Sequence, residues 1–164
     1  MIYRILLFLI MISFNVSFSQ KKKEIKKYGI KTITTTETQN GKTITDSKIT
    51  YDATGEKIEE TNYNKDGLLK STTKFKYNKN GDPVEETEFD DKNVLKEKRT
   101  MKYNALGEKT EELTTDKDNK TIKKSVYTYD ARGFKADRKT YDAAGTLIST
   151  KKYTYGIKKL AETD

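Results

Sequence analysis

The chain is predicted to form an all-β fold: an antiparallel β-meander of about ten strands, built from 26-residue YD-type hairpin repeats, in a single-layer or partly curled sheet. Two observations predict it. Residues that suit tight turns recur at alternating intervals of 12 and 14 residues. Between the turns, short segments alternate polar with apolar side chains, a pattern typical of half-buried strands.

The turn residues define the repeat. Asparagine stands at two places in the series and, like glycine, tolerates a positive φ. The series runs through Gly29, Gly41, Gly55, Gly67, Gly81, Asn93, Gly107, Asn119, Gly133 and Gly145. An aromatic residue followed by Asp or Asn usually stands four residues earlier, as Tyr51 and Asp52 precede Gly55. The Asp or Asn side chain can accept hydrogen bonds from backbone N–H groups two residues on, which predicts hairpin loops of three to five residues.

The segments between turns read as strands. Residues 70–77, KSTTKFKY, place Ser71, Thr73, Phe75 and Tyr77 on one side and three lysines and one threonine on the other. Neighbouring segments joined by tight turns pair in an antiparallel sheet. A sheet of this width is expected to twist and to have at most one covered face. No helix is expected after residue 20.

The ends of the chain differ from its middle. Residues 1–19 carry one positive charge, Arg4, before an apolar run, and small residues precede Gln20. This pattern predicts a secretory signal peptide cleaved before Gln20; an uncleaved membrane anchor is the alternative. The protein is therefore expected in the periplasm, at the cell surface or outside the cell. The expected organisation is a signal peptide over 1–19, a basic segment over 20–28, a β-repeat domain over 29–157 and a tail over 158–164.

Several turns share a motif with a known family. The motifs Tyr-x-Tyr-Asp-x-x-Gly at residues 127–133 and Tyr-Asp-x-x-Gly at 51–55 and 141–145 resemble the repeats of the Rhs/YD-repeat family. The resemblance implies a β-strip, as in the large secreted or surface proteins of that family, some of which enclose a toxic cargo or take part in carbohydrate or cell-surface contact. With about five repeat units and no toxin domain, this chain is expected to form the strip without the closed shell.

The residue types argue against catalysis. The chain contains no histidine and no cysteine, the usual bases, nucleophiles and transition-metal ligands. Three carboxylate doublets recur every 26 residues, but adjacent strand residues point to opposite faces and cannot act as a pair. The doublets are Glu59-Glu60, Glu85-Glu86 and Glu111-Glu112. We expect no enzyme activity, no cofactor and no bound metal.

Charge limits the partners. The chain has 33 basic and 25 acidic residues, and the two kinds alternate from strand to strand. This favours cross-strand ion pairs and a soluble surface over nucleic-acid binding. The excess lysines at the two ends predict at most a weak attraction to anionic surfaces. Lysine near an edge strand also discourages aggregation between sheets.

Rows of aromatic residues are the candidate binding site. Residues 26 apart should line the same end of the strands. One row holds Tyr51, Tyr77, Tyr103, Tyr129 and Tyr155, and beside it lie Phe75, Tyr127 and Tyr153 with Ile49 and Met101. A second row at the other end holds Tyr63, Phe89 and Tyr141 and is broken at Thr115. The rings either pack together to hold a thin sheet or form a platform for a glycan or an envelope protein. The competing hypothesis is a structural spacer or assembly subunit that pairs through its sheet edges.

Overall fold

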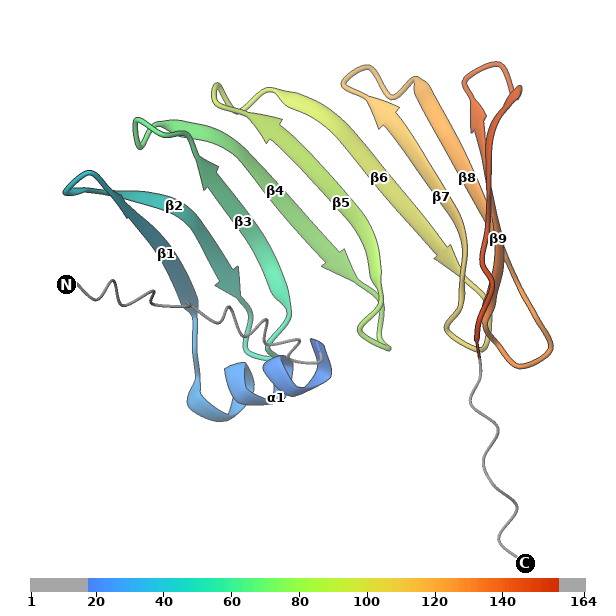
Figure 1. Ribbon diagram of the computed structural model, residues 1–164, viewed down its shortest axis with the longest axis horizontal. Coiled ribbons are helices and arrows are strands. Elements are labelled where there is room, and N and C mark those ends of the chain that lie inside the picture. The colour runs from blue at the N-terminus through green and yellow to red at the C-terminus, as the bar shows by residue number, and fades with distance from the viewer. Residues whose placement is uncertain (1–17, 157–164) are drawn as a thin grey trace, which may run out of the picture.

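The computed structural model describes residues 18–156 and contains one helix and one ten-stranded antiparallel sheet. The strands pair in chain order from β1 to β10, which confirms the predicted meander (Figure 1). The elements are α1 (Phe18–Tyr28), β1 (Thr32–Gln39), β2 (Lys42–Tyr51), β3 (Lys57–Tyr63), β4 (Leu69–Tyr77), β5 (Pro83–Asp90), β6 (Leu95–Tyr103), β7 (Lys109–Asp116), β8 (Thr121–Tyr129), β9 (Lys135–Asp142) and β10 (Leu147–Lys152). The sheet is open and twisted, with β1 and β10 as its two edges. The predicted tail and most of the predicted signal peptide lie outside the described residues.

The turns between β2 and β10 follow the predicted chemistry. Asp52 Oδ1 accepts hydrogen bonds from the backbone N–H groups of Thr54 and Glu56, both at 2.9 Å. Gly55, with φ of 84°, then supplies the left-handed step. The same side-chain bonds recur at Asn64, Asn78, Asp90, Asn104, Asp116, Asp130 and Asp142. Gly67, Gly81, Asn93, Gly107, Asn119, Gly133 and Gly145 all have positive φ, as predicted.

The first hairpin has a shorter loop than predicted. Gln39 pairs directly with Lys42, so only Asn40 and Gly41 connect β1 to β2. Both have positive φ, 51° and 77°, as a type I′ turn requires. The prediction of a three- to five-residue loop is therefore wrong at Gly41, because the Asn-Gly dipeptide selects the two-residue turn instead.

The helix α1 contradicts the expectation of no helix after residue 20. Its sequence, FSQKKKEIKKY, is rich in lysine with glutamine and glutamate, which favour helix, and contains a single β-branched residue, Ile25. Gly29 ends this helix and does not close a hairpin. The Ile30 N–H donates to the Ile25 carbonyl at 3.0 Å and the Gly29 N–H to that of Lys26 at 3.3 Å, the bonding pattern of a Schellman cap.

The helix covers one end of the first hairpins. Ile25 is only 3% exposed, and the Lys22 ammonium pairs with the buried carboxylate of Glu56 in the β2–β3 turn. Figure 1 shows α1 beside this turn, below β1, β2 and β3. The helix thus shields the turns at the N-terminal edge of the strip.

The two faces of the sheet differ in burial. Face A is the side that carries the paired row Met101, Glu112, Ser125 and Thr140, and face B carries the row Lys76, Glu85, Thr100, Leu113 and Lys124. The strand residues that are buried all lie on face A: Ser71, Met101, Thr114, Ser125, Tyr127 and Thr140. Face A is therefore the covered face, which agrees with the expectation of at most one.

Candidate binding surfaces

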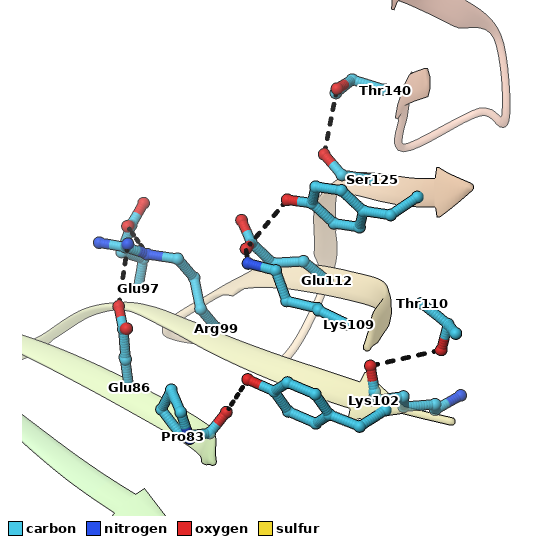
Figure 2. Close-up of polar contacts among 12 residues, drawn as sticks. Pro83, Glu86, Glu97, Arg99, Lys102, Lys109, Thr110, Glu112, Ser125 and Thr140 are labelled. Carbon is cyan, nitrogen blue, oxygen red and sulfur yellow. Dashed lines mark hydrogen bonds and ion pairs between the residues drawn. The ribbon is translucent and has the colours of Figure 1, made fainter. Parts of the chain in front are cut away.

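The first tyrosine row serves to fasten the sheet. The Tyr77 hydroxyl donates a hydrogen bond to the Lys57 carbonyl at 2.8 Å, which joins the end of β4 to the start of β3. The three later tyrosines repeat this contact with the residue twenty positions earlier: Tyr103 with Pro83 (Figure 2), Tyr129 with Lys109 and Tyr155 with Lys135. Tyr51 makes a backbone contact instead, since its N–H donates to the Lys31 carbonyl at 2.9 Å. The hydroxyls of Tyr77 and the three later tyrosines are therefore occupied within the fold.

Burial and nearby acids change the ionisation of this row. Burial, and then the neighbouring Glu56 carboxylate, raise the pKa of Tyr77 to about 12. Burial also raises the pKa of Tyr51, Tyr103 and Tyr129. The folded state therefore favours the neutral phenol that donates these hydrogen bonds.

Alkaline pH should destabilise the sheet through these phenols. Below pH 10 both folded and unfolded chains keep the Tyr77 proton, so the full contribution to stability is present. As pH rises toward 12, the unfolded chain loses the proton first and the free energy of unfolding falls. Tyr77→Phe should cost about 0.5–1.5 kcal/mol at neutral pH through the lost hydrogen bond. It should also make the alkaline loss shallower; an equally steep loss in urea titrations of both proteins would exclude Tyr77 as its source.

The inner column on face A consists of Phe75, Met101, Tyr127 and Tyr153, and lysines lie over its three rings. Lys57 Nζ lies 4.2 Å from the Phe75 ring centre, and Lys109 Nζ lies 4.8 Å from that of Tyr127. Each lysine is also paired with a glutamate three residues on, Lys57 with Glu60 at 2.7 Å and Lys109 with Glu112 at 2.6 Å (Figure 2). In the repeat between these two, proline (Pro83) stands at the position of the lysine. The column residue of that repeat is Met101, which has no aromatic ring.

The column rings do not stack on one another. Within residues 18–156 the one close ring pair is Phe134 with Tyr155, whose centroids lie 5.1 Å apart. Tyr127 is only 7% exposed. The rings of face A are thus engaged by lysine, glutamate and backbone groups, which gives them a part in holding the sheet.

The second aromatic row lies on face B, and its three rings are half-buried. Tyr63, Phe89 and Tyr141 pair across the strands with Leu69, Leu95 and Leu147. At the predicted break in the row, threonine replaces both the aromatic residue and its leucine partner, because Thr115 pairs with Thr121. Large exposed apolar side chains gather along the same end of the strands: Leu68, Leu69, Val94, Ile122, Leu147 and Ile148.

Two shallow hollows open on face B beside this row. One is lined by Phe89, Leu95 and Thr87 together with lysines. The other is lined by Tyr141, Leu113, Val126 and Thr121, with the turn at Gly145 at its rim. Each hollow combines an aromatic ring with aliphatic and basic neighbours, a lining suited to a partner with apolar and anionic groups.

Lysine-rich ion pairs border the hollows. Glu85 pairs with Lys76 at 2.7 Å and Lys98 at 2.8 Å, and these hydrogen bonds lower the pKa of its carboxyl group. Glu111 sits in the same way between Lys124 and Lys102, which lower its pKa. Along its paired rows face B carries eight lysines (Lys48, Lys74, Lys76, Lys98, Lys102, Lys124, Lys139 and Lys152) against four acids (Glu59, Glu85, Glu111 and Asp137). Face B is therefore basic overall.

The carboxylate doublets are divided between the faces. Glu59 pairs with Lys74 on face B, whereas Glu60 pairs with Thr73 on face A. The described part of the chain contains no cluster of three or more acidic residues placed to hold a metal ion. In that part there is also no helix long and apolar enough to cross a membrane. The two carboxylates of this doublet, Glu59 and Glu60, therefore face opposite sides of the sheet and cannot share one proton-transfer site.

No family model and no curated protein matches the sequence. Among solved structures the chain is similar to TarM of S. aureus, with a TM-score of 0.30 and 18% identity over 77% of this chain and 22% of TarM. It is also similar to a protein of unknown function from Bacteroides fragilis, with a TM-score of 0.40 and 14% identity over 77% of this chain and 95% of that one. A porin-like protein from Bacteroides uniformis has a TM-score of 0.34 and 14% identity over 71% of this chain and 74% of that one.

Proposed function

We propose that the protein is an exported, non-catalytic binding module of the cell envelope or surface, which contacts a glycan or a protein partner through face B. The contact surface is the row Tyr63, Phe89 and Tyr141 with the leucines paired to them. One observation carries the proposal: two of the three leucines paired to this row are exposed, Leu69 at 36% and Leu147 at 50%. Four of the five tyrosine hydroxyls in the other row donate to backbone carbonyls within the fold.

The composition of the surface supports this role. A continuous exposed apolar patch ordinarily marks a contact site on a protein. The lysines of face B border the patch and can attract a partner that carries negative charge. Export rests on the predicted signal peptide and the YD-like motif, and it places the patch where envelope polymers and envelope proteins are available.

Removing the rings of the row tests the proposal. Replacing Tyr63, Phe89 and Tyr141 together with serine should weaken binding to the recognised member of a purified envelope polysaccharide and protein panel about tenfold or more. Tyr28→Ser is the matched control, since Tyr28 is 68% exposed on α1 and away from the row. Binding that survives the triple substitution in a folded protein would contradict the proposed contact surface.

The open sheet supports a second candidate, a spacer or assembly subunit. All residues of β10 are exposed, and so are all but one of β1. An unpaired strand offers backbone donors and acceptors to another sheet. Concentration-dependent assembly in analytical ultracentrifugation, together with no binding to any panel member, would favour this candidate over the binding module.

A further inference from the structure

The fourth repeat reverses a charge that the first three keep. Residues 60, 86 and 112 are glutamate at 26-residue intervals, but the next position is Arg138. In the earlier copies each carboxylate has a cationic partner: Lys57 for Glu60, Arg99 for Glu86 and Lys109 for Glu112. In the fourth copy Lys135 is equivalent to Lys57 and Lys109, but the residue three positions on is Arg138 and not a glutamate.

The reversal groups three cations on face A. Arg138 pairs across the strands with Tyr127 on one side and Lys151 on the other. Lys135 Nζ lies 5.0 Å from the Tyr127 ring centre and 5.5 Å from that of Tyr153, and Lys151 Nζ lies 5.9 Å from the latter. Like charges on neighbouring strands repel one another unless an anion compensates them.

Arg138 also has unused hydrogen-bonding capacity. Its Nε is buried and has no hydrogen-bond partner among the described residues. Within residues 18–156 neither Arg138, Lys135 nor Lys151 forms an ion pair with a carboxylate, whereas Glu112, the nearest column acid, is held by Lys109. A buried donor of this kind points to a partner group outside residues 18–156.

We propose that Lys135, Arg138 and Lys151 bind the carboxylate of an acidic saccharide, with the Tyr153 ring as the platform for its sugar ring. A guanidinium fork flanked by ammonium groups suits an oxyanion, because charge-assisted hydrogen bonds are the strong ones. The half-exposed Tyr153 offers an apolar ring face next to them. This site lies on the opposite face from the apolar row and stands independently of the proposed function.

A charge substitution that restores the repeat pattern tests this site. Arg138→Glu gives Lys135 the carboxylate that Lys57 and Lys109 have, so the fold should be kept. Lys23→Glu makes the same change of charge on an exposed residue of α1, away from both faces of the proposed sites. The probe is an oligogalacturonate, compared with a neutral galactose oligomer of equal length by isothermal titration calorimetry of the full chain.

The protein should bind the oligogalacturonate and not the neutral oligomer. Arg138→Glu should weaken this binding about tenfold or more, and Lys23→Glu should change it less than about twofold. Lys151→Glu should reproduce the loss if Arg138→Glu lowers stability. No binding by the unmodified protein, or equal weakening by the substitutions at 138 and 23, would overturn the site. Because no residue of the face B row is altered, either result leaves the proposed function to its own test.

Discussion

Gly55→Ala is expected to destabilise the protein by about 3 kcal/mol and to detach α1 from the sheet. Gly55 has φ of +84°, so any side chain there adopts a strained backbone, which costs about 1–2 kcal/mol. A Cβ atom would also lie 2.8 Å from the Lys22 backbone carbonyl oxygen of α1. Because backbone cannot move aside as a flexible side chain can, the helix must shift and expose Ile25 and the Glu56 carboxylate.

Gly107→Ala is the matched control for this prediction. Its φ is +78°, but a Cβ atom there would meet nothing within 4 Å, so only the backbone strain remains. Asn93→Gly should be neutral or mildly stabilising, since φ at Asn93 is already +60°. Urea titrations followed by circular dichroism measure both the stability and the helical signal. If the two alanine substitutions lower the free energy of unfolding equally, α1 does not pack closely against the turn at Gly55.

Tyr127→Ala is expected to cost about 3 kcal/mol, near the lower end for removal of a buried aromatic side chain. Tyr127 is 7% exposed on face A. Its ring lies beneath Lys109 and Lys135, and its hydroxyl donates to the Glu112 carboxylate at 3.3 Å. The substitution removes the ring, two cation–π contacts and this hydrogen bond together. Tyr141→Ala on face B should cost about 1 kcal/mol, because its ring is only half-buried and lies opposite Leu147 and Lys124.

The repeat could be predicted because its turns are set by local chemistry. Asp52 and its equivalents bond backbone N–H groups within four residues, so the spacing of Asp or Asn and glycine marks each loop without knowledge of distant contacts. The departures from the prediction are local as well. Gly29 fits the spacing of the turn residues, although it ends a helix. The signal for a helix end was the apolar pair Ile25 and Ile30, which flanks the glycine as in a Schellman cap.

The separation of the aromatic rows could not be predicted, because it depends on register. Each strand from β3 to β10 has one unpaired residue near its start, and these irregularities determine which rings lie opposite lysine and which opposite leucine. Sequence alone fixes neither the hydroxyl contact from Tyr77 to Lys57 nor the lysine cover on Phe75. Arg138, by contrast, is visible in the sequence as the one basic residue in a column of glutamates.

The two tyrosine substitutions on opposite faces test most directly the central claim that face A holds the sheet and face B is its contact surface. Urea titration of Tyr127→Ala and Tyr141→Ala at the same pH measures the free energy of unfolding for each. The division of the faces predicts that the substitution at 127 costs about 2 kcal/mol more than the one at 141. Equal costs, or the larger cost at 141, would contradict it, because the face B ring would then be part of what holds the sheet together.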